Sequence, residues 1–347
     1  MNDRSTLPIL ANVLIQTEEN ELVLTATDLD VGIQCRFPLA QPVEKGAVTL
    51  PARKLTTIIR ELPGELVTLE AKKNQTAALT CGGSSFRIHG LPAEDFPAFP
   101  TPQQNEGVAL PQAALRELVA KTGYAMSFEE TRFILNGALL ETQKARLMMV
   151  ATDGRRLALA SAPTGGQERQ PLHAVIPSKT IRELGRLLQG DDPDEVILTP
   201  LKDNQLIIRF GAVTIVTRLI DGQFPQYDKV IPAPSKHTVS CSREALINAL
   251  RRVSLMTTAA SQAVVFELAP DRLVVSKESA EVGSAREELP VAYRGDPMTI
   301  AFNPEFWLDV LKVLDSDEVS IEVAGPDRPA VIRQPNFTYL VLPMKLA

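Results

Sequence analysis

Residues 174–188 read "AVIPSKTIRELGRLL", which is a short apolar run, a Pro-Ser pair and then apolar residues at helical spacing. This spacing predicts a strand that ends in a cap and continues as an amphipathic helix. The same unit occurs at 48–62, "VTLPARKLTTIIREL", and at 299–314, "TIAFNPEFWLDVLKVL". Pro51, Pro177 and Asn303 are separated by one repeated interval of 126 residues. Because this period is too long for a solenoid, we expect three tandem domains with separate cores, at 1–105, 106–236 and 237–347.

A second strand–helix start occurs in only two of the copies, at 109–122 and 239–254. Its counterpart in the first copy would lie before Met1, so we expect the first copy to lack its opening strand and most of its first helix. The sequence leaves open whether this reflects the gene, a wrong start codon or a fragment. Short β-type runs such as 21–27 and 205–210 fill much of the rest, and "GGSSF" (82–86) predicts a hairpin turn. The expected fold class is α+β, with antiparallel sheets and few helices.

The phrase Ala-Thr-Asp ends an apolar run twice, in "VLTATDLDVGIQC" (23–35) and in "VATDGRRLALAS" (150–161). Asp28 and Asp153 could form a catalytic pair, and a β-rich hydrolase using Asp153 is one alternative function. We favour a turn, because each Asp follows a strand and Asp-Gly is a strong turn dipeptide. The third copy has "VVSKES" instead, and an enzyme rarely keeps a catalytic phrase in two domains while losing it in a third. We therefore expect no catalytic residue.

Composition excludes several classes of protein. The 347 residues contain no apolar run long enough to span a membrane, and the N-terminus does not read as a signal peptide. The three cysteines, Cys35, Cys81 and Cys241, are odd in number and widely spaced, which favours reduced thiols in the cytoplasm. The three histidines are isolated, and no phosphate-binding loop or dinucleotide fingerprint is present, so we expect neither metal nor cofactor. The net charge of −6 argues weakly against nucleic acid.

The distribution of charge is more informative than its sum, because basic residues gather on the expected helices. Lys179, Arg182 and Arg186 share one face of their helix, opposite its apolar residues. We expect corresponding faces on the other copies, which suggests one basic surface on an acidic protein. Contacts from such a surface would be to phosphates and would carry no sequence information. The candidate residues are Arg53, Lys54, Arg60, Lys179, Arg182, Arg186, Arg243, Arg251 and Arg252.

The C-terminal stretch "TYLVLPMKLA" (338–347) is unusually apolar for a chain terminus. One interpretation is a final strand in the core. The other is that Val341, Leu342, Pro343 and Met344 line a binding groove, since exposed Pro and Met suit adaptable surfaces.

Several stretches together resemble the bacterial sliding clamp, the β subunit of DNA polymerase III, from Thr6 to Leu346. They are "TLPILANVLIQ", "LTATDLDVGI", "LPARK", "LPAEDFP", "TRFILNGALLE", "VATDGRRLALAS", "DGQFPQYDKVIP", "FNPEFWLDVL" and "YLVLPMKL". The resemblance implies three similar domains per chain, with strands outside and two helices per domain facing a central hole. It also implies a head-to-tail homodimer that forms a ring, slides on double-stranded DNA and tethers the replicative polymerase without catalysing a reaction. A third alternative is a clamp-derived protein that is no longer loaded.

The resemblance also implies functional residues. Arg4, Arg53, Lys54, Arg60 and Lys179 match DNA-facing positions. A pocket for short peptides of the polymerase, the clamp loader and other DNA-processing proteins would lie between the second and third domains. Its residues are Leu135, Thr152, Gly154, Arg155, Arg156, Leu157, Pro225, Lys229, Val230, Asn303, Phe306, Leu340, Val341, Leu342, Pro343, Met344, Lys345 and Leu346. Arg155 stands where the family often has His, and Lys229 where it often has Arg. We expect Arg155 and Arg156 to offer donors to a bound peptide and the apolar members to bury its anchors.

Overall fold

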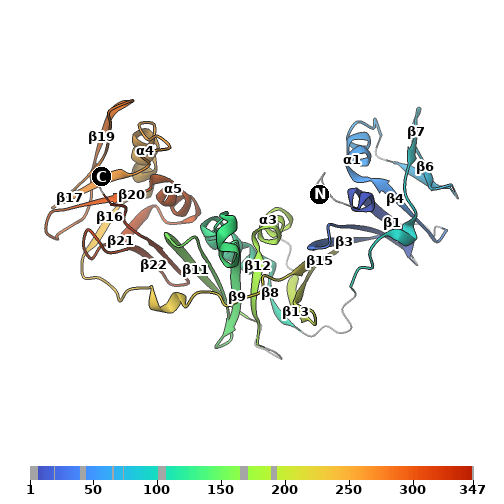
Figure 1. Cartoon of the computed structure of the whole chain (residues 1–347), viewed down its shortest axis with the longest axis horizontal. Helices are drawn as coiled ribbons and strands as arrows, with labels where there is room; N and C mark the ends of the chain where they lie inside the picture. Colours follow the sequence, from blue (N-terminus) through green and yellow to red (C-terminus); the bar gives the residue numbers. More distant parts are fainter. Residues whose placement is uncertain are drawn as a thin grey trace. The chain divides into compact units, whose positions relative to one another are not determined.

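The computed structural model describes residues 7–18, 20–39, 44–64, 66–72, 74–100, 107–164, 171–188 and 194–345. The chain forms two compact units, drawn in Figure 1 with colours that follow the sequence. The first comprises Met1–Gln112, Gln167–Gln170 and Asp192–Leu219, and the second comprises Ala113–Gly166, Pro171–Asp191 and Ile220–Ala347. Each unit contains one eight-stranded antiparallel sheet and one smaller sheet.

The described elements repeat in one order, which confirms the three tandem copies predicted from the sequence. The first copy contains η1 (Pro8–Ala11), β1 (Asn12–Glu18), β2 (Glu21–Thr27), β3 (Val31–Pro38), β4 (Gly46–Pro51), α1 (Ala52–Arg60), β5 (Thr68–Ala71), β6 (Thr76–Cys81), β7 (Ser84–His89) and η2 (Ala93–Asp95). The helix expected within 48–62 and the strand expected at 21–27 therefore form almost as predicted.

The second and third copies each begin with a strand and a helix that have no counterpart among the described residues of the first. The second contains β8 (Val108–Pro111), α2 (Gln112–Thr122), η3 (Gly123–Ala125), η4 (Glu130–Leu135), β9 (Gly137–Gln143), β10 (Arg146–Thr152), β11 (Arg156–Pro163), β12 (His173–Pro177), α3 (Ser178–Leu187), β13 (Glu195–Leu201), β14 (Gln205–Phe210), β15 (Val213–Arg218) and η5 (Tyr227–Lys229). The third contains β16 (Thr238–Ser242), α4 (Arg243–Ser254), β17 (Val264–Ala269), β18 (Arg272–Ser279), β19 (Gly283–Pro290), β20 (Met298–Phe302), α5 (Pro304–Val313), β21 (Glu318–Glu322), β22 (Ala330–Gln334) and β23 (Phe337–Val341).

Each large sheet is shared by two neighbouring copies. In the first unit the order is β4-β1-β2-β3-β15-β14-β13-β8, so β3 of the first copy pairs with β15 of the second. In the second unit the order is β12-β9-β10-β11-β23-β22-β21-β16, so β11 of the second copy pairs with β23 of the third. Because these sheets cross the borders between copies, the two compact units divide the second copy between them.

The two smaller sheets are formed by the strands of the first and third copies that are not part of a large sheet. They have the orders β5-β6-β7 in the first unit and β19-β18-β17-β20 in the second. The hairpin of β6 and β7 turns at Gly82 and Gly83, and Gly82 has a φ of 56°, as the predicted hairpin turn requires. The outer strands β7 and β19 are therefore sheet edges.

The helices differ in how well they are packed. Helix α5 buries Pro304, Trp307, Val310 and Leu311, and Trp307 stacks against Phe266 and Phe302. Helix α3 buries three residues, whereas α1 has no fully buried residue. No helix among the described residues is long and apolar enough to cross a bilayer.

Candidate functional site

The Ala-Thr-Asp phrase forms the turn between β10 and β11. Asp153 Oδ1 accepts hydrogen bonds from the backbone N–H groups of Arg155 and Arg156 at 2.9 and 3.0 Å. Gly154 completes the turn with a φ of 84°, and its N–H donates to Thr152 Oγ1 at 3.0 Å. In the first copy, Asp28 accepts from the N–H groups two and three residues ahead in the same way. The turn interpretation is confirmed, because both aspartate carboxylates accept hydrogen bonds from the backbone N–H groups of their own turn.

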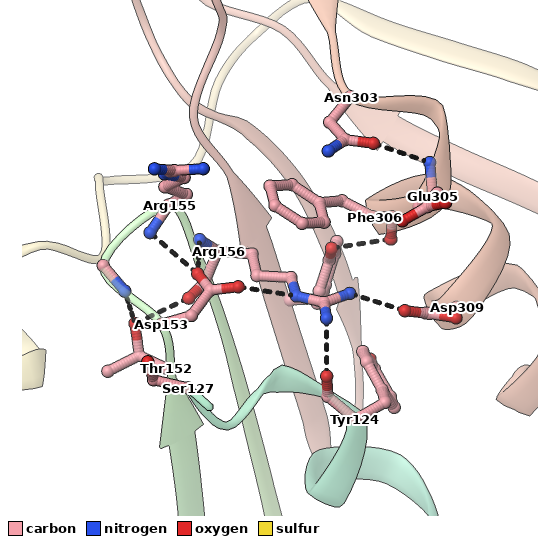
Figure 2. Close-up of polar contacts among 12 residues, drawn as sticks. Tyr124, Ser127, Thr152, Asp153, Arg155, Arg156, Asn303, Glu305, Phe306 and Asp309 are labelled. Atoms are coloured by element: carbon pink, nitrogen blue, oxygen red, sulfur yellow. Dashed lines mark hydrogen bonds and ion pairs between the residues drawn. The ribbon is translucent and has the colours of Figure 1, made fainter. Parts of the chain in front are cut away.

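Arg156 is bound within the protein, which corrects our expectation that it offers donors to a peptide. Its Nε donates to Asp153 Oδ2 at 3.1 Å, its Nη1 to Asp309 Oδ2 at 2.8 Å, and its Nη2 to the carbonyl of Tyr124 at 2.6 Å. Figure 2 shows these contacts converging on one guanidinium from the turn, from α5 and from η3. The side chain is only 9% exposed and lies over the rings of Tyr124 and Phe306, 5.5 and 4.4 Å from their centroids.

The surroundings of Arg156 favour its charge. Burial is the largest single effect and acts to lower the pKa of the guanidinium, but the hydrogen bond to Asp309 and the charges of nearby acidic groups together raise this pKa above its ordinary value. Burial also raises the pKa of the neighbouring Tyr124 and Tyr339 hydroxyls, so both remain neutral. Tyr339 donates to the carbonyl of Phe306 at 2.7 Å. The cluster is a charged pair inside a shell of neutral aromatic groups.

The C-terminal stretch combines both interpretations made from its sequence. Leu340 and Val341 belong to β23 and are buried in the core. Leu342 and Met344 are exposed, and Pro343 between them is half-buried. The Leu342 N–H donates to the carbonyl of Arg155 at 2.8 Å, and the Met344 N–H donates to the carbonyl of Ala301 at 2.7 Å. This segment is therefore fixed to the β10–β11 turn and to β20. Leu346 lies outside the described residues.

Other predicted pocket residues divide into a buried floor and an exposed surface. Leu135 and Leu157 pack with Leu340 and Val331 in one core cluster, so they can only support a bound anchor from below. The Thr152 hydroxyl donates to the carbonyl of Arg156, and the Asn303 side chain caps α5 by accepting from the N–H of Glu305. The exposed or half-buried members, which we call the partner surface, are Gly154, Arg155, Pro225, Lys229, Val230, Phe306, Leu342, Pro343, Met344 and Lys345.

A cavity of about 370 Å³ lies beside this surface and shares Lys229 and Val230 with it. The remaining lining includes Pro232 and Ala233 of the segment after η5, and Arg328 of the β21–β22 loop. The sequence reasoning missed Arg328, because "AGPDRPA" (324–330) reads only as a turn. The other lining residues are Ser235, Glu322, Ala324, Pro329 and Val331.

The structure leaves most of the basic candidates exposed, and two of them make bonds within the protein. On α1, Arg53, Lys54 and Arg60 are exposed, and on α3, Lys179 is half-buried while Arg182 and Arg186 are exposed. Arg251 of α4 is also exposed. Arg4 lies outside the described residues.

Two candidates on α4 make bonds within the protein. Arg243 donates to the carbonyls of Ser316 and Leu311 at 2.7 and 3.1 Å, which satisfies the C-terminal end of α5. Arg252 forms a two-pronged ion pair with Glu287 at 2.7 Å. Nine residues separate the two arginines, which is two and a half helical turns, so they project from opposite sides of α4.

No group of three or more His, Cys, Asp and Glu side chains within the described ranges could hold a metal ion. The three cysteines are free thiols.

Comparison with known proteins identifies the family. Models of the DNA polymerase III beta subunit match residues 1–100 with the N-terminal domain, 109–226 with the central domain and 228–345 with the C-terminal domain. The chain belongs to the DNA polymerase III beta subunit family. The chain is 34% identical to the beta sliding clamp of Pseudomonas putida over 346 residues, covering 99% of this chain and 94% of the relative. It is 33% identical to the beta sliding clamp of Vibrio cholerae over 349 residues, covering 100% and 94%.

Solved beta sliding clamps have the same fold. The Pseudomonas aeruginosa sliding clamp bound to griselimycin matches with a TM-score of 0.93 and 32% identity, covering 99% of this chain and 94% of that one. The Bacillus subtilis clamp matches with a TM-score of 0.92 and 28% identity, covering 100% and 94%. The three clamp domains expected from the sequence are thereby shown.

Proposed function

We propose that two copies of this chain close head to tail into a ring around duplex DNA and hold the replicative polymerase there. The chain is a sliding clamp, a non-catalytic processivity factor. Tethering keeps the polymerase at a high effective concentration on the template, so sliding replaces dissociation. This role places the protein in the cytoplasm, with the chromosome.

The proposal of a closed ring is supported by the large sheets, each of which is shared between two neighbouring copies. At both internal junctions, the strand that precedes the strand–helix unit of one copy pairs with the last strand of the next copy, β3 with β15 and β11 with β23. Among the described residues, the equivalent strands that have no such partner within the chain are β19 and β7. By the same rule, β19 of one chain should pair with β7 of a second chain. An exposed sheet edge is a template for such pairing, and Phe86 on β7 is an exposed aromatic residue. Two identical junctions of this kind close a ring.

The repeat also gives the register of this junction. Gly32 lies opposite Val216, and Leu157 opposite Leu340, at equivalent positions of their hairpins. The hairpin pairs Ser276 with Arg286 and Cys81 with Ser84 extend this equivalence to β19 and β7. Gln34 and Leu159, the equivalents of Arg286, lie opposite Thr214 and Thr338, the equivalents of Ser85, so Arg286 of one chain should lie opposite Ser85 of the other.

Cysteine crosslinking tests the proposed junction. We expect the variant Ser85→Cys/Arg286→Cys to form a covalently closed dimer of twice the 37.8 kDa chain mass on mild oxidation. The matched control is Ser85→Cys/Val282→Cys, because Val282 is exposed in the β18–β19 turn outside the proposed register. Equal crosslinking of both variants, or a monomer in solution, would contradict the junction.

The proposed DNA contacts are electrostatic. The residues are Arg53, Lys54, Arg60, Lys179, Arg182, Arg186 and Arg251, with Arg4 as a further candidate. No aromatic side chain alternates with them on the helix faces, which supports contacts to phosphates without base stacking. Attraction to phosphates is nearly equal at every step along DNA, so a ring held this way can slide.

The proposed peptide contacts are those of the partner surface and the adjoining cavity. Val230, Leu342 and Met344 offer exposed apolar area, and Arg155 and Lys229 offer donors. Burial of one Leu or Phe anchor contributes roughly 1.5–3 kcal/mol, so a short peptide with two anchors should bind near micromolar after association costs. The polymerase, the clamp loader and other DNA-processing proteins are the proposed partners.

A further inference from the structure

The residue Arg156 occupies the centre of the proposed peptide site without being available to a peptide. Each of its three guanidinium nitrogens already donates a hydrogen bond, to Asp153, Asp309 and the Tyr124 carbonyl. The rings of Tyr124 and Phe306 also lie against the guanidinium. These bonds use three of its five N–H groups, and because the side chain is only 9% exposed, the guanidinium offers little surface to a peptide.

The acceptors of Arg156 belong to separate segments that carry the partner surface. Asp153 lies in the β10–β11 turn beside Gly154 and Arg155, while Asp309 lies on α5, two turns after Asn303 and one after Phe306. Figure 2 shows the guanidinium between these two segments, with the turn on one side and the helix on the other.

The C-terminal stretch spans the same two segments. Leu342 is hydrogen-bonded to the turn through the Arg155 carbonyl, and Met344 to β20 through the Ala301 carbonyl, immediately before α5. The distance between the turn and α5 therefore sets how far apart the exposed Leu342 and Met344 side chains are held. A peptide whose anchors fit this spacing binds without a cost for ordering the surface.

We propose that Arg156 is a positioning residue, whose ion pair with Asp309 fixes the β10–β11 turn against α5 and so sets the affinity of the partner surface for peptides. This role rests on the proposed function. It differs from the role of a direct peptide donor, which Arg155 can fill because its side chain is exposed.

The substitution Asp309→Asn separates the two roles. It releases one nitrogen of Arg156 and removes no group of the partner surface. If Arg156 positions the surface, the affinity for a peptide should fall by about tenfold, the size of typical coupling effects. If Arg156 were a direct donor, its release should leave the affinity unchanged or increase it. Arg156→Lys should also weaken binding, because an ammonium lacks the planar fork that reaches three acceptors.

The measurement is a fluorescence anisotropy titration of the full chain with a fluorescein-labelled hexapeptide that carries Gln, Leu and Phe, with griselimycin as a competing probe. The matched control is Lys312→Ala, since Lys312 is an exposed partner of Asp309 at 3.7 Å on the same helix and joins no second segment. Asp309→Glu retains the carboxylate and should recover part of the affinity. In hydrogen exchange, the Leu342 and Met344 amides should exchange faster in Asp309→Asn, while its dimer mass stays that of the wild type.

Wild-type binding with an unchanged affinity in Asp309→Asn would overturn the positioning role alone. Failure of the wild-type chain to bind either probe would overturn the proposed peptide site, and this role with it. A double-mutant cycle in which Arg156→Lys and Asp309→Asn act additively would also overturn the proposal, because residues in one network are non-additive.

Discussion

Two turns in this protein have the same backbone hydrogen bonds but carry different residues in the left-handed position. Gly154 occupies the left-handed conformation in the β10–β11 turn, whereas Leu29 occupies it in the β2–β3 turn with a φ of 78°. A left-handed conformation is strained for residues with a Cβ. The glycine also leaves room for Arg132, whose Nη1 donates to the Asp153 carbonyl at 3.0 Å. The second turn is therefore relaxed and covered by an arginine, while the first is strained and exposed.

We expect Gly154→Ala to lower the free energy of unfolding by about 1–2 kcal/mol, because alanine is strained in this conformation. The new Cβ would lie 2.7 Å from Arg132 Nη1 and displace that flexible side chain. The matched substitution Leu29→Gly should not lower stability, since glycine accepts the same backbone without strain. Urea unfolding of both variants checks this, and equal destabilisation would contradict it.

We expect the tyrosines to limit the stability of the folded protein at alkaline pH. Burial raises the pKa of Tyr124, Tyr227, Tyr293 and Tyr339, and these are the four tyrosines of the chain. Their neutral forms contribute stability that is complete below the unfolded pKa of about 10 and is lost as pH rises through the folded values. In a pH titration, phenolate absorbance should rise above this pH together with loss of circular dichroism. Ionisation of the folded protein at the ordinary pKa would contradict this.

Local sequence predicted the turns but could not predict the role of Arg156. "TDGRR" places two arginines beside a turn, where both read as exposed donors. The acceptors that bury Arg156 are Asp309 and Tyr124, which lie 153 and 32 positions away in the sequence. No period or motif connects these positions, and only the pairing of β11 with β23 brings them together.

At the scale of elements, the helices differ in their neighbours. Helices α4 and α5 pack against each other in the third copy, and Gly185 of α3 contacts Val119 of α2 in the second. Helix α1 has no such neighbour among the described residues, and Ile59 on it is 44% exposed. The sequence predicted all five helices within about two residues, because capping and periodicity are local signals. It could not predict burial, which depends on the neighbouring helix.

We expect the amides of α1 to exchange with solvent faster than those of α3 and α5. A helix with few buried contacts opens at a lower free energy than the surrounding core. Native-state hydrogen exchange with mass spectrometry measures the three helices in one experiment, with α5 as the internal control. Equal protection of α1 and α5 would show that the exposed face of α1 is covered in solution.

At the scale of the whole molecule, a protein of net charge −6 is proposed to bind a polyanion, which requires segregated charge. The expected surface is formed by exposed arginines and lysines of α1, α3 and α4, and the sequence predicted it in outline. It did not predict the internal bonds of Arg243 and Arg252, because a helical repeat of basic residues does not show which side chains are used by carbonyls or carboxylates of the same domain.

Charge reversal tests the DNA-facing surface. Arg182→Glu/Arg186→Glu should weaken duplex binding at all sequences and reduce the dependence of affinity on salt, by about one unit of slope for each phosphate that is no longer neutralised. Arg294→Glu is the control, since this exposed arginine lies after β19, outside the proposed surface. An equal reduction of affinity in the control would mean that only net charge matters.

The ring itself is tested by topology. The chain with Ser85→Cys and Arg286→Cys is assembled at low concentration with a nicked circular plasmid, oxidised, and then washed in high salt, which removes electrostatic contacts. We expect the crosslinked dimer to remain on the circular DNA and to be released when one cut makes the plasmid linear. Loss of the protein from the circle in high salt, or its retention after the cut, would contradict a clamp that encircles DNA.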